Sequence, residues 1–256
     1  MGIHPSAMVS SKAELGSDVS IGPFAIVQDD VIIGSGTQIG SHALVAEGTR
    51  IGEECVIHHG AVVGTIPQDL KFGGEKTTLE IGDRTVIREY ATVNRGTKHS
   101  MKTVVGSDCM LMAYSHVAHD CVVGNRVIMA NGASLGGHIV VEDWVILSAF
   151  VGVHQFARLG QHCFVGALYR VPKDVPPFML AVGDPLRPVG LNIEGLRRRG
   201  FTPETIAALK RAHRLLFRSQ LNTSQAIAEV RRTLPQTEEI RALLEFIEKS
   251  ERGIIK

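Results

Sequence analysis

The stretch from Leu111 to His138 reads LMAYSHVAHDCVVGNRVIMANGASLGGH, and it decides the fold of the chain. Apolar residues recur in it at every sixth position: Leu111, Val117, Val123, Met129 and Leu135. Between them are polar residues that a repeating scaffold does not require: His116, His119, Asp120 and His138. The stretch therefore combines a six-residue structural repeat with the residue types of a chemical site.

The six-residue period continues through most of the sequence. Counting by six from Ile3 to Val171 meets an aliphatic residue or Met everywhere except at Asp69, Glu75 and His99. A strand repeats every two residues and a helix about every 3.6, so neither produces this period. If six residues form one flat face and three faces close one coil, the apolar column fills the interior. We therefore predict an all-β solenoid, a parallel β-helix, over residues 1–184.

The neighbouring columns fit the same coil. The position after the apolar residue is often Gly, as at Gly34 and Gly136, which we attribute to a corner that requires unusual φ and ψ angles. The four cysteines share a column of small residues: Cys55, Cys109, Cys121 and Cys163. We expect buried thiols there, without disulfides, which is typical of a cytoplasmic protein.

Two segments, 65–78 and 95–104, interrupt the repeat but keep its phase. They are predicted to be loops that leave the coil. Long excursions from a compact scaffold are often functional, so we expect them to contribute to the site.

After Pro185 the repeat stops and helical signals begin. Thr202-Pro203 is a helix N-cap followed by Pro at the first helical position, and further helices are predicted from about 223 to 234 and from 237 to 251. Residues 185–256 hold 14 Lys and Arg against 8 Asp and Glu. We predict a basic C-terminal helical domain, 185–256, that covers the open end of the coil.

Composition excludes several classes of protein. A formal net charge of +1 gives no general attraction to nucleic acid. No apolar run reaches the roughly 18 residues that cross a membrane, and the N-terminus lacks the pattern of a secretory signal. We therefore expect a cytoplasmic protein with no nucleic-acid partner and no transmembrane segment.

The 18-residue coil predicts which polar residues meet. Asp120 and His138 are 18 positions apart and should lie one above the other, with His119 and His154 on the same edge of successive coils. His116 precedes the corner, and the adjacent Gly136-Gly137 pair offers open backbone N–H groups. An imidazole beside a carboxylate, near a donor for an oxyanion, is typical of general-base catalysis.

Other interpretations of these residues remain open. The imidazoles could bind zinc, but no further carboxylate or Cys ligand accompanies them, so we expect no metal. His58, His59 and His162 are expected to be solvated surface residues. The run Arg197–Arg199 is either a solvated helix face or a phosphate-binding group.

Specific motifs carry a resemblance to a known family. They are MAYSHVAHD, QDLK, IGDRTVIREYATVNRGT, GHIVVEDW, VHQF, DVPP and NIEGLRRRGF, and they span essentially the whole chain in one order. The sequence closely resembles the UDP-N-acetylglucosamine 3-O-acyltransferases. This resemblance implies a left-handed β-helix, a homotrimer with sites between subunits, no cofactor, and the first step of lipid A synthesis. It also implies transfer of a 3-hydroxyacyl group from acyl carrier protein to the sugar 3-hydroxyl, and a basic C-terminal region suits docking of that acidic carrier.

The resemblance also implies roles for single residues. His119 is the expected general base, Asp120 orients it, and the Gly137 N–H holds the oxyanion. The expected substrate-binding residues are Gln68, Asp69, Lys71, His116, His138, His154, Gln155, Asn192, Glu194, Arg198 and Arg199. The last four match the group that holds the uridine diphosphate, and Ala167 matches the position that sets acyl-chain length.

Asn94 departs from the family pattern, which often has a His there, so a 3-amino sugar nucleotide stays open as the acceptor. Three other classes are alternatives. A later N-acyltransferase of the pathway is expected to carry an N-terminal domain, whereas here the repeat begins at Ile3. A hexapeptide carbonic anhydrase would need zinc, and a non-catalytic scaffold explains neither the histidines nor the two loops.

Overall fold

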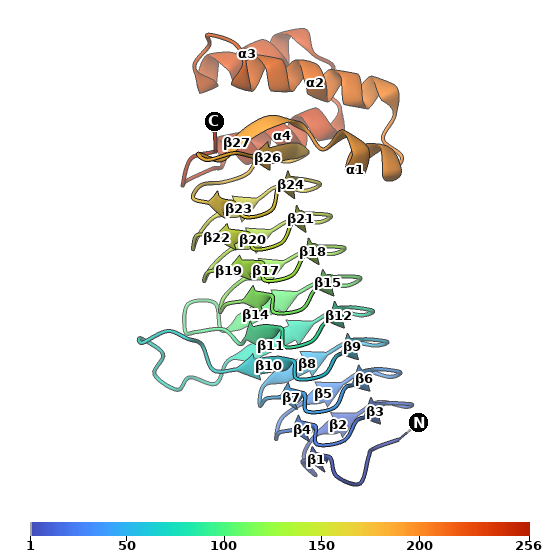
Figure 1. Ribbon diagram of the computed structural model, residues 1–256. Coiled ribbons are helices and arrows are strands. Elements are labelled where there is room, and N and C mark those ends of the chain that lie inside the picture. The colour runs from blue at the N-terminus through green and yellow to red at the C-terminus, as the bar shows by residue number, and fades with distance from the viewer. Residues whose placement is uncertain (1) are drawn as a thin grey trace.

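Three parallel sheets form the walls of one long prism, with helices at its C-terminal end (Figure 1). This computed structural model describes residues 2–256. The chain passes from the first face to the second and the third and then starts the next coil. We name the corners by the faces that they join: the first–second, second–third and third–first edges.

The strands are short and stack in order along each face. The first face holds β1 (Met8–Val9), β4 (Ile26–Val27), β7 (Leu44–Val45), β10 (Val62–Thr65), β13 (Thr92–Asn94), β16 (His116–Val117), β19 (Ser134–Leu135), β22 (Gly152–Val153) and β25 (Arg170–Val171). The second face holds β2 (Glu14–Leu15), β5 (Ile32–Ile33), β8 (Thr49–Ile51), β11 (Thr78–Ile81), β14 (Lys102–Val105), β17 (Val122–Val123), β20 (Val140–Val141) and β23 (Arg158–Leu159). The third face holds β3 (Ser20–Ile21), β6 (Gln38–Ile39), β9 (Val56–Ile57), β12 (Val86–Ile87), β15 (Met110–Leu111), β18 (Ile128–Met129), β21 (Ile146–Leu147), β24 (Phe164–Val165), β26 (Met179–Val182) and β27 (Arg187–Leu191).

The predicted 18-residue coil is confirmed by the pairing register. Val117 pairs with Leu135, and Leu135 pairs with Val153, each 18 residues further along the chain. These side chains are almost fully buried and belong to one continuous core. All four cysteines are buried and unpaired with one another, and burial raises the pKa of Cys109 to about 11. The core therefore stacks one apolar side chain per face on the next.

The glycines after the apolar column are required for a different reason from the predicted one. Gly34 does not have a positive φ, but a Cβ there would lie 2.5 Å from the carbonyl carbon of Gly52 in the next coil. Positive φ values occur two residues later in the repeat, as at Asp120 (φ 59°) and His138 (φ 62°). Close approach of neighbouring coils, and not backbone conformation, selects Gly in this column.

Both loop excursions leave the coil at the first–second edge. The first excursion, 66–77, joins β10 to β11, and the second excursion, 95–101, joins β13 to β14. The predicted limits of 65–78 and 95–104 were slightly wide, because the outer residues pair in strands. The two excursions therefore emerge from the edge that also carries His119.

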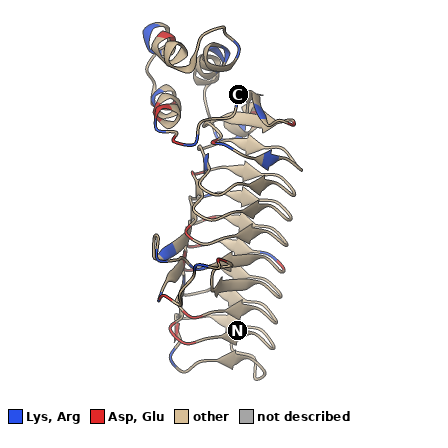
Figure 2. Ribbon diagram, turned by 90° about the vertical axis from the view of Figure 1, so that its left-hand side faces the viewer, with Lys and Arg blue, Asp and Glu red and all other residues tan. Residues whose placement is uncertain are grey.

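The C-terminal part begins with an antiparallel hairpin of β26 and β27 that extends the third face. The helices α1 (Ile193–Arg198), α2 (Pro203–Phe217), α3 (Thr223–Thr233) and α4 (Glu238–Glu248) follow it. Thr202 caps α2 as predicted, whereas the helical region starts at Ile193 and not at position 185. These helices carry charged residues of both signs, whereas the strands of the coil carry few charges (Figure 2). Within residues 2–256, no helix has the length and apolar character needed to cross a membrane.

Candidate active site

His119 and Asp120 form a hydrogen-bonded pair at the first–second edge. His119 Nδ1 lies 2.7 Å from Asp120 Oδ2, and the Asp120 side chain is completely buried. Asp120 also accepts hydrogen bonds from the backbone N–H and the hydroxyl groups of Thr97 and Ser100. The second excursion therefore closes over Asp120 and fixes the orientation of its carboxylate.

The surroundings of Asp120 keep it ionised. Burial alone would raise its pKa, but hydrogen bonds from Ser100, His119 and Thr97 outweigh burial and hold the pKa well below its usual value. A carboxylate can only accept hydrogen bonds, so His119 Nδ1 carries the proton of the pair. The lone pair of the neutral imidazole is then on Nε2, where a general base needs it.

Gly137 lies directly against the imidazole of His119. A Cβ atom at position 137 would come within 2.6 Å of His119 Cε1 and 2.9 Å of Nε2, so glycine is needed to leave room for the ring. The Gly137 N–H has no acceptor among the residues that the structure describes. A hydrogen-bond donor with no internal partner therefore lies next to the basic nitrogen.

His116 and His138 flank the pair as neutral imidazoles. Burial lowers the pKa of His116, and the proximity of His119 lowers it further. Burial also lowers the pKa of His138, although the charge of Asp120 opposes this effect. His116 Nδ1 is 2.7 Å from Thr92 Oγ1, whereas His138 Nδ1 is 3.8 Å from Asp120 Oδ2, too far for a hydrogen bond.

A cavity of about 580 Å³ opens beside His119 on the first face. Six of the predicted residues line it: Gln68, His116, His119, Gly137, His154 and Gln155. Asp120 and His138 do not line the cavity, but both contact His119. The floor is open at Gly152, where an added Cβ would meet nothing within 4 Å. The predicted cluster thus comes together around one accessible space.

Asp69 and Lys71 lie on the first excursion beside Gln68 but outside the lining of the cavity. Their local contact is structural, because Asp69 Oδ1 accepts the Lys71 N–H at 3.0 Å. At the base of this excursion, Asn94 is buried and donates to Thr65 Oγ1 and to the Ile66 carbonyl, each at 3.0 Å. Asn94 therefore braces the excursion.

Asn192 and Arg199, predicted to hold the uridine diphosphate, lie at the second–third edge. Asn192 is buried, caps α1 and donates to the His162 carbonyl at 3.0 Å. Arg199 Nη1 donates to His162 Nδ1 at 3.0 Å, and its guanidinium lies 4.9 Å from the centre of the Trp144 ring. Both side chains are thus engaged in packing α1 against the coil, and His162 is buried, contrary to the expectation of a solvated residue.

The other predicted residues outside the cavity are exposed. Glu194 and Arg198 form an ion pair on the surface of α1, with N–O distance 3.1 Å. Ala167 is exposed at the third–first edge, between β24 and β25. It therefore lies across the first face from His119 and not along the same edge.

Arg199 lies at the same height along the β-helix as part of the cavity lining, but on a different edge. Trp144 follows Gly137 within one turn, and His162 follows His154 within the next. Arg199 contacts both Trp144 and His162, so it is level with the cavity but on another edge. A single chain does not bring the two groups of residues together.

A metal ion is the other use to which these side chains could be put. Ligand atoms of His119, Asp120 and His138 all lie within 4.8 Å of one another. However, Asp120 already accepts five hydrogen bonds, more than the roughly four lone-pair sites of a carboxylate. A metal ion would have to displace one of these donors, so the donor set fits a hydrogen-bonded base better than a metal centre.

Comparisons with known proteins agree with this geometry. A family model described as UDP N-acetylglucosamine O-acyltransferase, domain 2, matches residues 174–255, and a bacterial transferase hexapeptide model matches 12–47, 30–65 and 102–137. The acyl-[acyl-carrier-protein]–UDP-N-acetylglucosamine O-acyltransferase of Thiobacillus denitrificans is 52% identical over 255 residues, which cover 99% of each chain. The chain belongs to this acyltransferase family. The similarly named protein of Janthinobacterium sp. is 48% identical over 259 residues, with 99% of each chain covered.

Solved structures of this acyltransferase family extend the agreement to the fold. The UDP-N-acetylglucosamine acyltransferase of Bacteroides fragilis superposes with a TM-score of 0.98 at 43% identity, and the matched region covers 99% of each chain. The Acinetobacter baumannii structure gives a TM-score of 0.96 at 41% identity with the same coverage. The predicted fold class, a left-handed parallel β-helix with C-terminal helices, is confirmed, as is the assignment as an acyltransferase.

The residues that hold the acyltransferase histidines in place carried no recognisable signal in the sequence. Thr97 and Ser100 bind Asp120, and Thr92 contacts His116. His99 packs edge-to-face on His138 with ring centroids 4.5 Å apart. Thr92 and Thr97 lie within a quoted motif, but only the folded path of the second excursion shows which side chains they contact.

Proposed function

We propose that the chain transfers a 3-hydroxyacyl group from acyl carrier protein to the 3-hydroxyl of UDP-N-acetylglucosamine, the first step of lipid A synthesis. Relatives about 50% identical bear the name of this acyltransferase. The observation that carries the mechanism is the position of the His119 imidazole, held between the buried carboxylate of Asp120 and the open N–H of Gly137. We expect this activity in the cytoplasm, without cofactor or metal.

In the proposed mechanism, His119 Nε2 removes the proton of the sugar 3-hydroxyl as the oxygen attacks the thioester carbonyl. Asp120 holds the proton on Nδ1 and stabilises the imidazolium that forms. The Gly137 N–H donates to the oxyanion of the tetrahedral intermediate. When the intermediate collapses, the carbon–sulfur bond breaks, and His119 returns its proton to the departing thiolate of the carrier.

The sugar nucleotide is proposed to lie in the cavity between the first excursion and the coil. Gln68, Asp69 and Lys71 approach it from the excursion, and Gln68 lines the cavity beside His119. The supporting imidazoles and amide are His116, His138, His154 and Gln155. Because the pKa values of His116 and His138 are lowered, both are neutral near pH 7 and donate or accept hydrogen bonds without adding charge.

The site is proposed to be completed by a neighbour in a homotrimer. Arg199 is level with the cavity along the β-helix axis. An adjacent subunit at the same height would therefore face the cavity with its Asn192, Glu194, Arg198 and Arg199. Two features support this arrangement: Arg198 is largely exposed, and Leu70 at the tip of the first excursion is fully exposed, which an assembled neighbour would cover. Since Arg199 is held by His162, Arg198 is the side chain better placed to bind phosphate.

The acyl chain is proposed to cross from His119 over the first face toward Ala167. The Cα of Gly152 gives this path an open floor. A small side chain at 167 leaves room for a medium to long chain, with Leu168 or Phe164 as further limits. The basic C-terminal region, residues 185–256, is the proposed docking surface for the carrier protein.

The test is incubation of the purified protein with UDP-N-acetylglucosamine and a panel of 3-hydroxyacyl carrier proteins. We expect mass spectrometry to show a sugar nucleotide heavier by one 3-hydroxyacyl group, dependent on both substrates. Parallel reactions with the 3-amino sugar nucleotide decide between ester and amide products. If correctly folded and assembled protein forms neither the ester nor the amide with any donor, the proposed function is refuted.

A further inference from the structure

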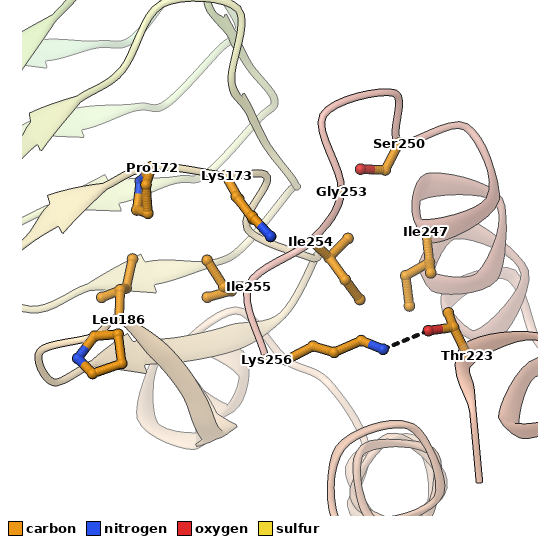
Figure 3. A pocket seen from close by; sticks show the side chains of 11 residues that line it. Pro172, Lys173, Leu186, Thr223, Ile247, Ser250, Gly253, Ile254, Ile255 and Lys256 are labelled. Carbon is orange, nitrogen blue, oxygen red and sulfur yellow. Dashed lines mark hydrogen bonds between the residues drawn. The ribbon is translucent and has the colours of Figure 1, made fainter.

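The end of the chain, Ser250–Lys256, forms a strap that fastens the helices to the last coil (Figure 3). Ile255 is buried in the core of the coil, and Ile254 is buried with the helices. Lys256 Nζ donates to Thr223 Oγ1 at 2.7 Å. The strap is thus anchored on both sides by apolar burial.

The buried carboxylate of Asp174 fixes the strap more closely. Asp174 Oδ2 accepts from Ser250 Oγ at 2.6 Å, and Asp174 Oδ1 accepts from the Arg158 N–H at 2.8 Å. The Asp174 backbone donates to the Gly253 carbonyl and accepts from the Ile255 N–H. The residue between these contacts, Arg252, is therefore held at a defined position on the coil.

Arg252 reaches the cavity lining. Its Nε donates to the Pro172 carbonyl at 2.9 Å, and its Nη2 lies 2.8 Å from His154 Nδ1. Two contacts from one planar guanidinium fix its orientation. His154 lines the same cavity as His119 and Gly137. Through Arg252, the strap thus directly contacts the candidate active site.

The chemistry of Arg252 determines the tautomer of His154. A guanidinium has only donors, so His154 Nδ1 must accept from it and cannot carry a proton. The Gln155 carbonyl, 3.1 Å from the same nitrogen, could only accept, and an Nδ1–H aimed at it would face the N–H of Arg252. The proton of neutral His154 is therefore on Nε2, which makes no hydrogen bond to any other residue of 2–256.

We propose that Arg252 is a positioning residue that holds His154 as the Nε2–H tautomer, so that Nε2 donates a hydrogen bond to an oxygen of the bound sugar nucleotide. The arrangement is the reverse of that at His119, where Asp120 accepts from Nδ1 and leaves a lone pair on Nε2. The same edge thus presents a base and, two turns further along the β-helix, a donor. The proposal rests on the proposed function only for the identity of the oxygen.

The first test needs no substrate. Long-range ¹⁵N–¹H correlation spectra of the assembled, histidine-labelled protein, with His154 assigned from a His154→Gln sample, report which ring nitrogen is protonated. We expect Nε2–H in the native protein and a mixture of tautomers in Arg252→Met. Nδ1–H in the native protein, or an unchanged tautomer in Arg252→Met, would overturn the proposal even if the enzyme is fully active.

The second test is kinetic. Arg252→Met should lower kcat/KM for the sugar nucleotide about tenfold, mainly through KM, because a charge-assisted hydrogen bond is lost. Arg252→Lys should recover part of this loss, and Arg252→Met in a His154→Gln background should have no further effect. Arg50→Met is the matched control, since Arg50 also donates to a backbone carbonyl, that of Asp30, but lies on β8, away from the strap and the C-terminal helices, and it should stay within about twofold. Equal losses with and without His154 would mean that Arg252 acts only on stability.

Discussion

Two edges of the β-helix each hold an imidazole beside a charged partner, with opposite consequences. At the first–second edge, His119 faces the carboxylate of Asp120 and has a free nitrogen toward a cavity. At the second–third edge, His162 accepts from the guanidinium of Arg199 and is buried among aromatic rings. The partner thus decides whether an imidazole in this repeat is placed to act as a base or is fixed as a packing residue.

The electrostatics of the two edges follow from these partners. Burial and then the nearby Arg199 lower the pKa of His162 to about 4, so it is neutral over the working range of most enzymes. In the proposed mechanism, by contrast, ionised Asp120 stabilises the imidazolium that forms when His119 takes up the sugar proton. Of these two edges, only the first–second edge is therefore suited to accept a proton in catalysis.

The largest expected difference between the edges comes from removing the base. His119→Ala should lower turnover by a factor of about 10²–10⁴, the usual contribution of a positioned base. His59→Ala, at an exposed imidazole elsewhere on the coil, is the control and should change turnover less than about twofold. Turnover close to the native value in His119→Ala, with the unfolding temperature unchanged, would contradict the assignment.

The next effect concerns the backbone under the base. Gly137→Ala should lower turnover by about 10²-fold, because the new Cβ would lie 2.6 Å from His119 Cε1 and displace both the ring and the oxyanion donor. Gly190→Ala is a matched control, since a Cβ there meets nothing within 4 Å. An active Gly137→Ala enzyme would show that the ring does not need this contact.

A smaller effect is expected at the far side of the first face. Ala167→Met should shift donor preference toward shorter acyl chains by about fivefold to tenfold, since overfilling an apolar slot costs about 1–3 kcal/mol. Competition between two donor lengths in one reaction measures this shift. The same product ratio as in the native enzyme would show that chain length is set elsewhere.

The smallest effect is on stability at the second–third edge. The pKa of His162 is lower in the folded state, about 4, than in the unfolded state, about 6.5, so the unfolded chain binds more protons between these values. Stability from this residue is therefore present above pH about 6.5 and is lost as the pH falls toward 4. When the pH is lowered from about 6.5 to 4, the unfolding temperature of His162→Phe should fall by a few degrees less than that of the native protein, as measured by calorimetry. An equal decrease in both proteins would exclude this role.

Sequence periodicity predicted the coil because each apolar residue repeats at a fixed register, as Val117, Leu135 and Val153 do. The same arithmetic brought His119, Asp120 and His138 together, since residues 18 apart must stack. It could not predict that Thr97 and Ser100 donate hydrogen bonds to Asp120, or that Arg252 donates one to His154. Those contacts depend on how the second excursion folds back and how the C-terminal strap returns over a long sequence separation, which no period encodes.

One active site is proposed to use both edges, each from a different subunit of a homotrimer. Mixing inactive His119→Ala with a separately inactivated Arg198→Ala tests this most directly. In randomly mixed trimers, one site in four joins an intact first–second edge to an intact second–third edge, so about one quarter of native activity should return after subunit exchange. No recovery, despite mixed trimers demonstrated by native mass spectrometry, would mean that each site is built within one chain.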